Sequence, residues 1–69
     1  MLIFYRSDNG QFTWRLRRSG NHRGLVTPNE SFVEKRGALG NFDATCDELG
    51  VTRKRRTEML ASARYDWDA

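Results

Sequence analysis

The chain is poor in the residues that build metal sites and catalytic centres. Its 69 residues hold one cysteine, Cys46, and one histidine, His22. One thiol cannot form an internal disulfide, and one cysteine with one histidine cannot supply the three or four ligands of a zinc site. His22 lies in a segment of loop composition and Cys46 on the apolar side of a predicted helix, so we expect an exposed histidine and a buried cysteine. The sequence therefore predicts no catalytic residue, no metal site, no cofactor and no enzyme.

Long hydrophobic runs are missing as well. No apolar run approaches the length of about 18 residues that a membrane span requires. Met1 leads directly into Leu-Ile-Phe-Tyr, without the basic stretch and the small-residue cleavage site of a signal peptide. We therefore expect a cytoplasmic protein that does not bind membranes. The small size and the arginine-rich composition suggest a bacterial or phage origin.

The chain has few apolar residues for a domain that must fold alone. Hydrophobic residues make up 38% of it, and a domain of this length buries only about 60% of the surface of its unfolded chain. Phe, Tyr and Trp together number eight, more than three strands and one helix can cover. We therefore predict a homodimer, or binding to another protein, with Tyr5, Tyr65 and Trp67 as interface candidates. The alternative is that the segment with Tyr65 and Trp67 folds back over its own sheet.

The first part of the chain carries the signal of a β-hairpin. An apolar run from Met1 to Arg6 is followed by Ser-Asp-Asn-Gly-Gln and then by strict alternation over residues 12–17. Phe12, Trp14 and Leu16 therefore face the core, and Thr13, Arg15 and Arg17 face outward.

The register of the first strand depends on the turn. A two-residue Asn9-Gly10 turn aligns Ile3 and Tyr5 with Trp14 and Leu16. A three-residue loop over residues 8–10, with Gly10 in the left-handed conformation, aligns Leu2 and Phe4 with them instead. We favour the three-residue loop.

A third strand and a helix follow. Leu25-Val26-Thr27 is long enough for a short strand that ends at Pro28. Ser31 to Glu34 forms a predicted capping box, although the glycines at 37 and 40 also allow a helix start nearer Lys35, or a close approach of the helix to the sheet. The helix ends at Gly50. Its apolar stripe consists of Leu39, Phe42, Cys46 and Leu49.

After Gly50, Thr52 can cap a second, shorter helix that runs from Arg53 towards Arg64. Met59, Ala63 and Trp67 are spaced by four along one side of this segment. Its first turn is basic, which opposes the helix dipole and disfavours the helix.

Several of these residues resemble the pattern of the YegP-like domain family, small domains without an assigned function. The resemblance covers about residues 2–49. It implies a β-β-β-α unit that occurs as a tandem pair or as a homodimer, and it implies no catalytic residue. The residues that carry it are Phe4-Tyr5-Arg6, Gly10 to Leu16, Phe32, Lys35, Ala38-Leu39 and Phe42.

Together the patterns predict an α+β domain of two layers. Residues 1–50 form the β-β-β-α unit, an antiparallel three-stranded sheet with one packed helix, and residues 51–69 form a basic and aromatic short helix or tail. The predicted function is a non-enzymatic homodimeric interaction module. The alternative is a weak, sequence-tolerant nucleic-acid-binding protein, because arginines release counterions from phosphate. Its binding residues are Arg15, Arg17, Arg53, Lys54, Arg55 and Arg56.

Overall fold

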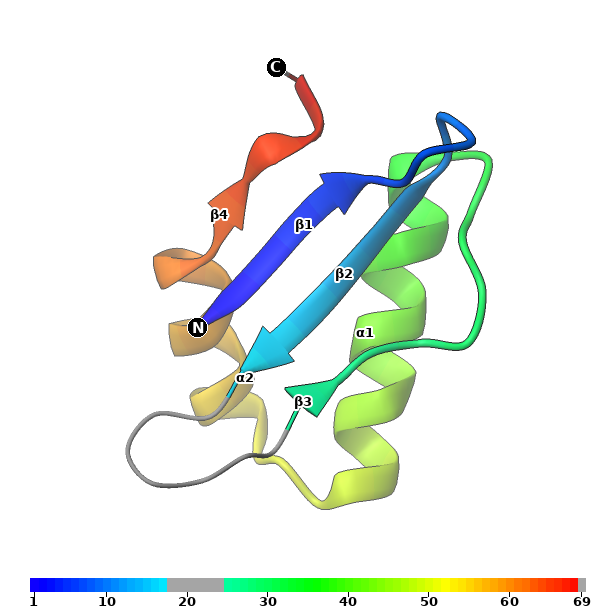
Figure 1. The fold of residues 1–69 in the computed structure, drawn as a ribbon. Coiled ribbons are helices and arrows are strands. Elements are labelled where there is room, and N and C mark those ends of the chain that lie inside the picture. Colours follow the sequence, from blue (N-terminus) through cyan, green and yellow to red (C-terminus); the bar gives the residue numbers. More distant parts are fainter. Residues whose placement is uncertain (18–24, 69) are drawn as a thin grey trace.

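The fold consists of one mixed sheet with two helices on one side of it (Figure 1). The computed structural model describes residues 1–17 and 25–68. Strands run in the order β3-β2-β1-β4 across the sheet. The neighbours β1–β2 and β2–β3 are antiparallel, and β1–β4 are parallel. The strands are β1 (Leu2–Arg6), β2 (Phe12–Arg17), β3 (Leu25–Val26) and β4 (Arg64–Tyr65), and the helices are α1 (Lys35–Leu49), α2 (Arg53–Ser62) and a short 3-10 turn, η1 (Asp66–Asp68).

The α+β class is confirmed, but the prediction of an antiparallel three-stranded sheet is wrong. The sheet has a fourth strand, β4, whose residues pair in parallel with Ile3 and Phe4 of β1. A strand of two residues is too short to show any alternation in the sequence, so only its tertiary pairing reveals it. The predicted loop over residues 19–24, which includes His22, lies outside the described residues.

The β1–β2 hairpin has the register that the three-residue loop predicts. Leu2 pairs with Leu16, and Phe4 pairs with Trp14. Gly10 has φ +82°, a left-handed conformation that glycine adopts without steric cost. Leu2, Phe4 and Trp14 consequently lie on one face of the sheet, and all three are buried.

Helix α1 begins at Lys35, which confirms the alternative start stated above, and the capping box predicted at Ser31 is not formed. The Ser31 hydroxyl donates a hydrogen bond of 2.6 Å to Gln11 instead, and Phe32 pairs with Phe12 through two backbone hydrogen bonds of 2.7 Å. A segment paired in this extended way cannot also be the first turn of a helix. A Cβ atom at Gly37 would lie 3.1 Å from Phe32 Cβ, so the helix passes close to this segment.

The buried stripe of α1 differs from the predicted one at its ends. Phe42 and Cys46 are buried and Leu39 is partly buried, as expected. Leu49, however, is 56% exposed, and Ala38 is fully buried. Gly50 ends the helix with φ 74°.

Helix α2 forms, and the segment after it closes the core. The Thr52 hydroxyl accepts a hydrogen bond of 3.1 Å from the Arg55 amide and caps the helix. The chain then folds back over its own sheet, which is the alternative stated above. The Tyr65 ring stacks on Phe4 with 5.2 Å between centroids, and Trp67, 6% exposed, lies 5.0 Å from Phe4. Both tryptophans are therefore buried within one chain.

Candidate functional site

The sheet has an outer face that points away from both helices (Figure 1). Side chains alternate along a strand, and residues paired across two strands lie on the same face. Since Phe4 and Trp14 point inward, their strand neighbours point outward. Arg64 and Leu25 join them because they pair with Ile3 and Arg17. We call this set the outer sheet face: Ile3, Tyr5, Thr13, Arg15, Arg17, Leu25 and Arg64.

Positive charge dominates the outer sheet face. Arg15 and Arg17 are exposed, and no acidic residue lies in any of the four strands of the described chain. The Arg15 guanidinium carbon lies 5.3 Å from the centre of the Tyr5 ring, so the two side chains form a cation–π pair. Arg64 forms an ion pair of 3.0 Å with Asp66, which follows β4 in η1.

A shallow polar hollow of about 430 Å³ continues this face towards the hairpin loop. Tyr5 and Thr13 line it together with residues 27–31. Thr13 is buried here, and its hydroxyl donates a hydrogen bond of 3.4 Å to the carbonyl of Glu30. Asp8 and Glu30 also line the hollow, so the face is basic at one end and acidic at the other.

The basic residues predicted to bind nucleic acid fall into two groups. Arg15 and Arg17 lie on the outer sheet face, whereas residues 53–56 lie in α2, on the opposite side of the sheet (Figure 1). Sequence reasoning missed Arg64, which lies on the same face as Arg15 with Ile3 between them, because nothing in the sequence indicates that β4 pairs with β1.

Arg56 plays a structural part. Its guanidinium forms ion pairs of 2.7 Å with Asp43 and 2.8 Å with Asp47 of α1. It also donates a hydrogen bond of 2.9 Å to the Val51 carbonyl. Hydrogen bonding to Asp43 and Asp47 raises the pKa of Arg56 above its usual value. With 12% of its side chain exposed, Arg56 joins α1 to α2 and is not free to contact phosphate. Arg53, Lys54 and Arg55 are exposed.

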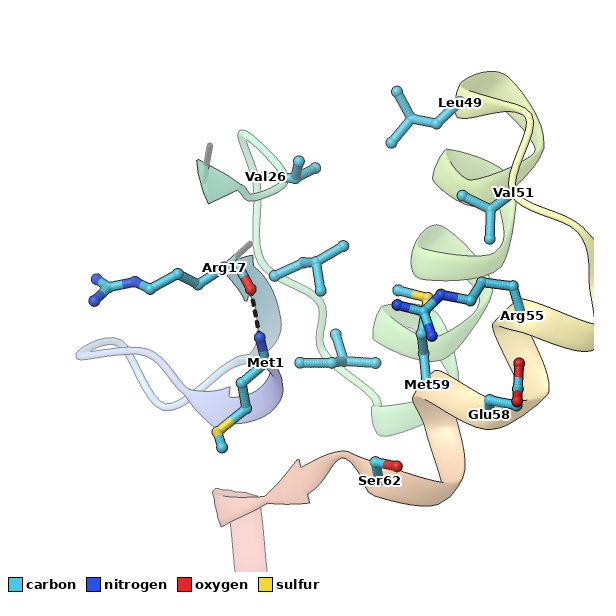
Figure 2. Close-up of a pocket in the computed structure, with 11 residues that line it drawn as sticks. Met1, Arg17, Val26, Leu49, Val51, Arg55, Glu58, Met59 and Ser62 are labelled. Carbon is cyan, nitrogen blue, oxygen red and sulfur yellow. Dashed lines mark hydrogen bonds between the residues drawn. The ribbon is translucent and has the colours of Figure 1, made fainter. Parts of the chain in front are cut away.

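A second concave site lies between the end of the sheet and the two helices. This groove has a volume of about 770 Å³. Figure 2 shows the Arg17 side chain running away from it, while the Arg17 carbonyl accepts a hydrogen bond from the Met1 amino group. No sequence pattern predicts this groove, because its lining comes from five separate segments. The residues that line it are Met1, Leu2, Leu16, Arg17, Val26, Leu49, Val51, Arg55, Glu58, Met59 and Ser62.

The three interface candidates have different surroundings. Tyr5 lies on the outer sheet face. Tyr65 is 43% exposed, and its hydroxyl donates a hydrogen bond of 2.9 Å to the Leu60 carbonyl. Trp67 is buried in the core, so the structure does not bring these three rings together on one surface.

Within the part of the chain that the structure describes, the reactive side chains do not form a cluster. Cys46 is buried on α1, and desolvation raises the pKa of its thiol. Among residues 1–17 and 25–68, no three His, Cys, Asp or Glu side chains come close enough to hold a metal ion. Over the same residues, no helix is long and apolar enough to span a membrane.

Comparisons of the chain with models of protein families, with curated proteins and with solved structures find no match. The resemblance to the YegP-like family therefore stays a prediction.

Proposed function

We propose that this chain is a non-enzymatic binding protein for single-stranded nucleic acid, and that the strand lies across the outer sheet face. The observation that carries the proposal is the arrangement of Arg15, Arg17 and Tyr5. Two exposed arginines and an aromatic ring share one open face, and no strand residue supplies a carboxylate to neutralise it. Basic side chains interleaved with an aromatic ring are the usual composition of a single-strand binding surface.

At the basic end of the outer sheet face, charge favours a polyanion over the same end of a second copy. In a two-fold symmetric dimer both copies use the same surface, and only residues near the two-fold axis meet their own equivalents. Stacking two outer sheet faces with their basic ends together would bring Arg15, Arg17 and Arg64 against arginines. A phosphate backbone gains from the same charges by releasing its counterions.

Tyr5 favours an unpaired strand over a duplex. The Arg15 guanidinium lies over its partly exposed ring, and an unpaired base can stack on this cation–π pair. Bases inside a duplex are already stacked on each other and offer only their edges. The expected binding is weak and tolerant of sequence, because stacking and phosphate contacts discriminate poorly among bases.

The homodimer stays a prediction. Its support from the sequence was the small apolar content of the chain together with its eight aromatic residues, and within one chain Trp14 and Trp67 are already covered. Solution mass, measured by light scattering over a range of protein concentrations, tests it independently of nucleic-acid binding.

The test is fluorescence anisotropy with a labelled oligothymidylate in a series of salt concentrations. The expected result is saturable binding that weakens steeply between about 50 and 200 mM salt. Replacing Arg15 and Arg17 together by Gln removes two phosphate contacts, and the slope of log K against log salt should then fall by about 1.4. Tyr5→Ala should weaken binding by about 1–3 kcal/mol through lost stacking.

The matched control removes the same two positive charges from the helices, and leaves the outer sheet face unchanged. The double variant Arg36→Gln with Arg53→Gln loses the same net charge from exposed positions of α1 and α2. It should bind the oligonucleotide nearly as well as the unmodified chain. Absence of binding at low salt contradicts the proposal, and so does an equal loss in the two double variants.

A further inference from the structure

The groove between the sheet and the helices has an apolar floor that the chain leaves open. Leu2 lies at its base and is buried, whereas Met1 and Leu49 at its edges are each more than half exposed. Leu16 and Val51 are partly buried between them. Its volume of about 770 Å³ falls within the range of about 300–1,000 Å³ in which small-molecule sites occur.

Arg55 provides the one positive side chain that reaches over this floor. Figure 2 shows it extending from α2 towards the sheet, whereas the Glu58 carboxylate stays beside α2. Within the described residues, no ion pair or side-chain hydrogen bond engages the Arg55 guanidinium. The adjacent Arg56 differs, because two carboxylates hold it. Arg55 therefore presents its hydrogen-bond donors at the groove.

We infer that the groove binds a small amphiphilic anion, namely a carboxylate with an unbranched hydrocarbon tail. The tail lies along Leu16, Leu49 and Val51, above the buried Leu2, and removes their exposed apolar surface from water. The carboxylate pairs with Arg55, whose planar fork of donors matches two carboxylate oxygens. A cationic amphiphile of the same length places its charge against the same arginine, so charge selectivity separates this site from general hydrophobic adsorption.

The direct test is an NMR titration with decanoate below its micelle concentration. Backbone amide signals of Leu16, Val26 and Val51 should shift and saturate, while that of Val33 stays in place. Val33 is an exposed apolar residue outside the groove, so it reports adsorption to any greasy surface. Decanoate should bind at least tenfold more tightly than decyltrimethylammonium. Equal affinities for the two amphiphiles, shifts that do not saturate, or shifts at Val33 as large as those at Val51 overturn the inference.

Two variants that each lose one positive charge test whether the carboxylate of bound decanoate pairs with Arg55. Arg55→Gln removes the proposed partner and should weaken decanoate binding about tenfold, while the binding of uncharged decanol stays the same. Arg53→Gln changes an exposed residue of the same helix that does not line the groove, and its affinity for decanoate should match the unmodified chain. Unchanged decanoate affinity in Arg55→Gln, or an equal loss in Arg53→Gln, overturns the inference. Circular dichroism checks that both variants keep their helices.

Discussion

The two faces of the sheet share the same strands and differ in almost everything else. The inner face carries aromatic rings packed edge to face, as in the contacts of Phe42 with Phe4 and Trp14, at 5.9 and 5.2 Å. Two helices and the C-terminal turn cover it. The outer face carries arginines, and neither helix covers it. Alternation along a strand thus separates the residues that hold the fold from the residues that can bind a partner.

Charge follows the same division. On the helical side, acidic and basic residues are mixed and joined by ion pairs, such as Lys35 with Asp68 and Arg56 with Asp43. On the outer sheet face, the exposed Arg15 and Arg17 have no carboxylate among the strand residues. The net charge of +3 therefore does not show that the arginines of the outer sheet face gather at one end of it, away from Asp8 and Glu30.

The largest expected effect contrasts two adjacent residues on opposite faces. Trp14→Ala should lower the free energy of unfolding by about 3–5 kcal/mol, because it leaves a cavity in the core. It also removes the 3.0 Å hydrogen bond from the indole to Asn41. Arg15→Ala should change the free energy by no more than about 0.5 kcal/mol. Urea unfolding followed by circular dichroism measures both.

If Trp14→Ala does not fold, Trp14→Phe keeps most of the ring and allows the comparison. If Trp14→Phe lowers the free energy of unfolding by less than Arg15→Ala does, the division between the two faces is contradicted.

The next effect concerns the cover of the inner face. Thr52→Ala removes the hydrogen bond that caps α2 and should destabilise the protein by about 1 kcal/mol. The control is Thr57→Ala, because the Thr57 hydroxyl bonds to the Arg53 carbonyl inside the helix and caps nothing. Chemical denaturation of the two variants measures the difference, and equal losses contradict the capping role of Thr52.

Two glycines of α1 differ in how close they lie to the packed layer. A Cβ atom at Gly40 meets nothing within 4 Å, so Gly40→Ala should stabilise the protein by about 0.5–1 kcal/mol through helix propensity. At Gly37 the new methyl group would lie 3.1 Å from Phe32, and Phe32 must move to admit it. Thermal unfolding should therefore show a smaller gain, or a loss, for Gly37→Ala. A larger gain at Gly37 contradicts the close approach.

The smallest effect depends on pH and reports on the desolvation of the Cys46 thiol in the core. Burial raises the pKa of the Cys46 thiol, so above about pH 8.5 the unfolded chain loses this proton more readily than the folded chain. The folded state then holds more protons, and the free energy of unfolding falls as the pH rises. The contribution of the raised pKa is thus complete at lower pH and is lost in alkali.

The measurement compares the unmodified chain with Cys46→Ala by denaturant unfolding between neutral and alkaline pH. Above the usual pKa of the thiol, the unfolding free energy of the unmodified chain should fall relative to that of Cys46→Ala. A constant difference across the range contradicts a desolvated thiol.

Local pattern was enough to predict the hairpin, the end of α1 and the cap of α2. Alternation over residues 12–17 assigned both faces of β2, and Gly10 selected the register, since each depends on residues close together in the sequence. The cap at Thr52 was found in the same way.

The errors concern pairings between distant segments. The extended pairing of Phe32 with Phe12 displaced the predicted capping box, because backbone hydrogen bonds to a strand competed with the helix start. The parallel pairing of β4 with β1 likewise has no local signal, and the groove and the position of Arg64 depend on such contacts. The split of the basic residues between two sides followed from the placement of α2.

The parallel pairing of β4 with β1 has a consequence for how the protein is made. Ile3 pairs with Arg64, and the Phe4 ring packs against the rings of Tyr65 and Trp67. During synthesis, β1 is made long before Tyr65 and Trp67, and until then the Phe4 ring lacks the two rings that cover it in the folded protein. Contacts so distant along the chain slow folding, so we expect the native core to form only after translation has passed residue 67.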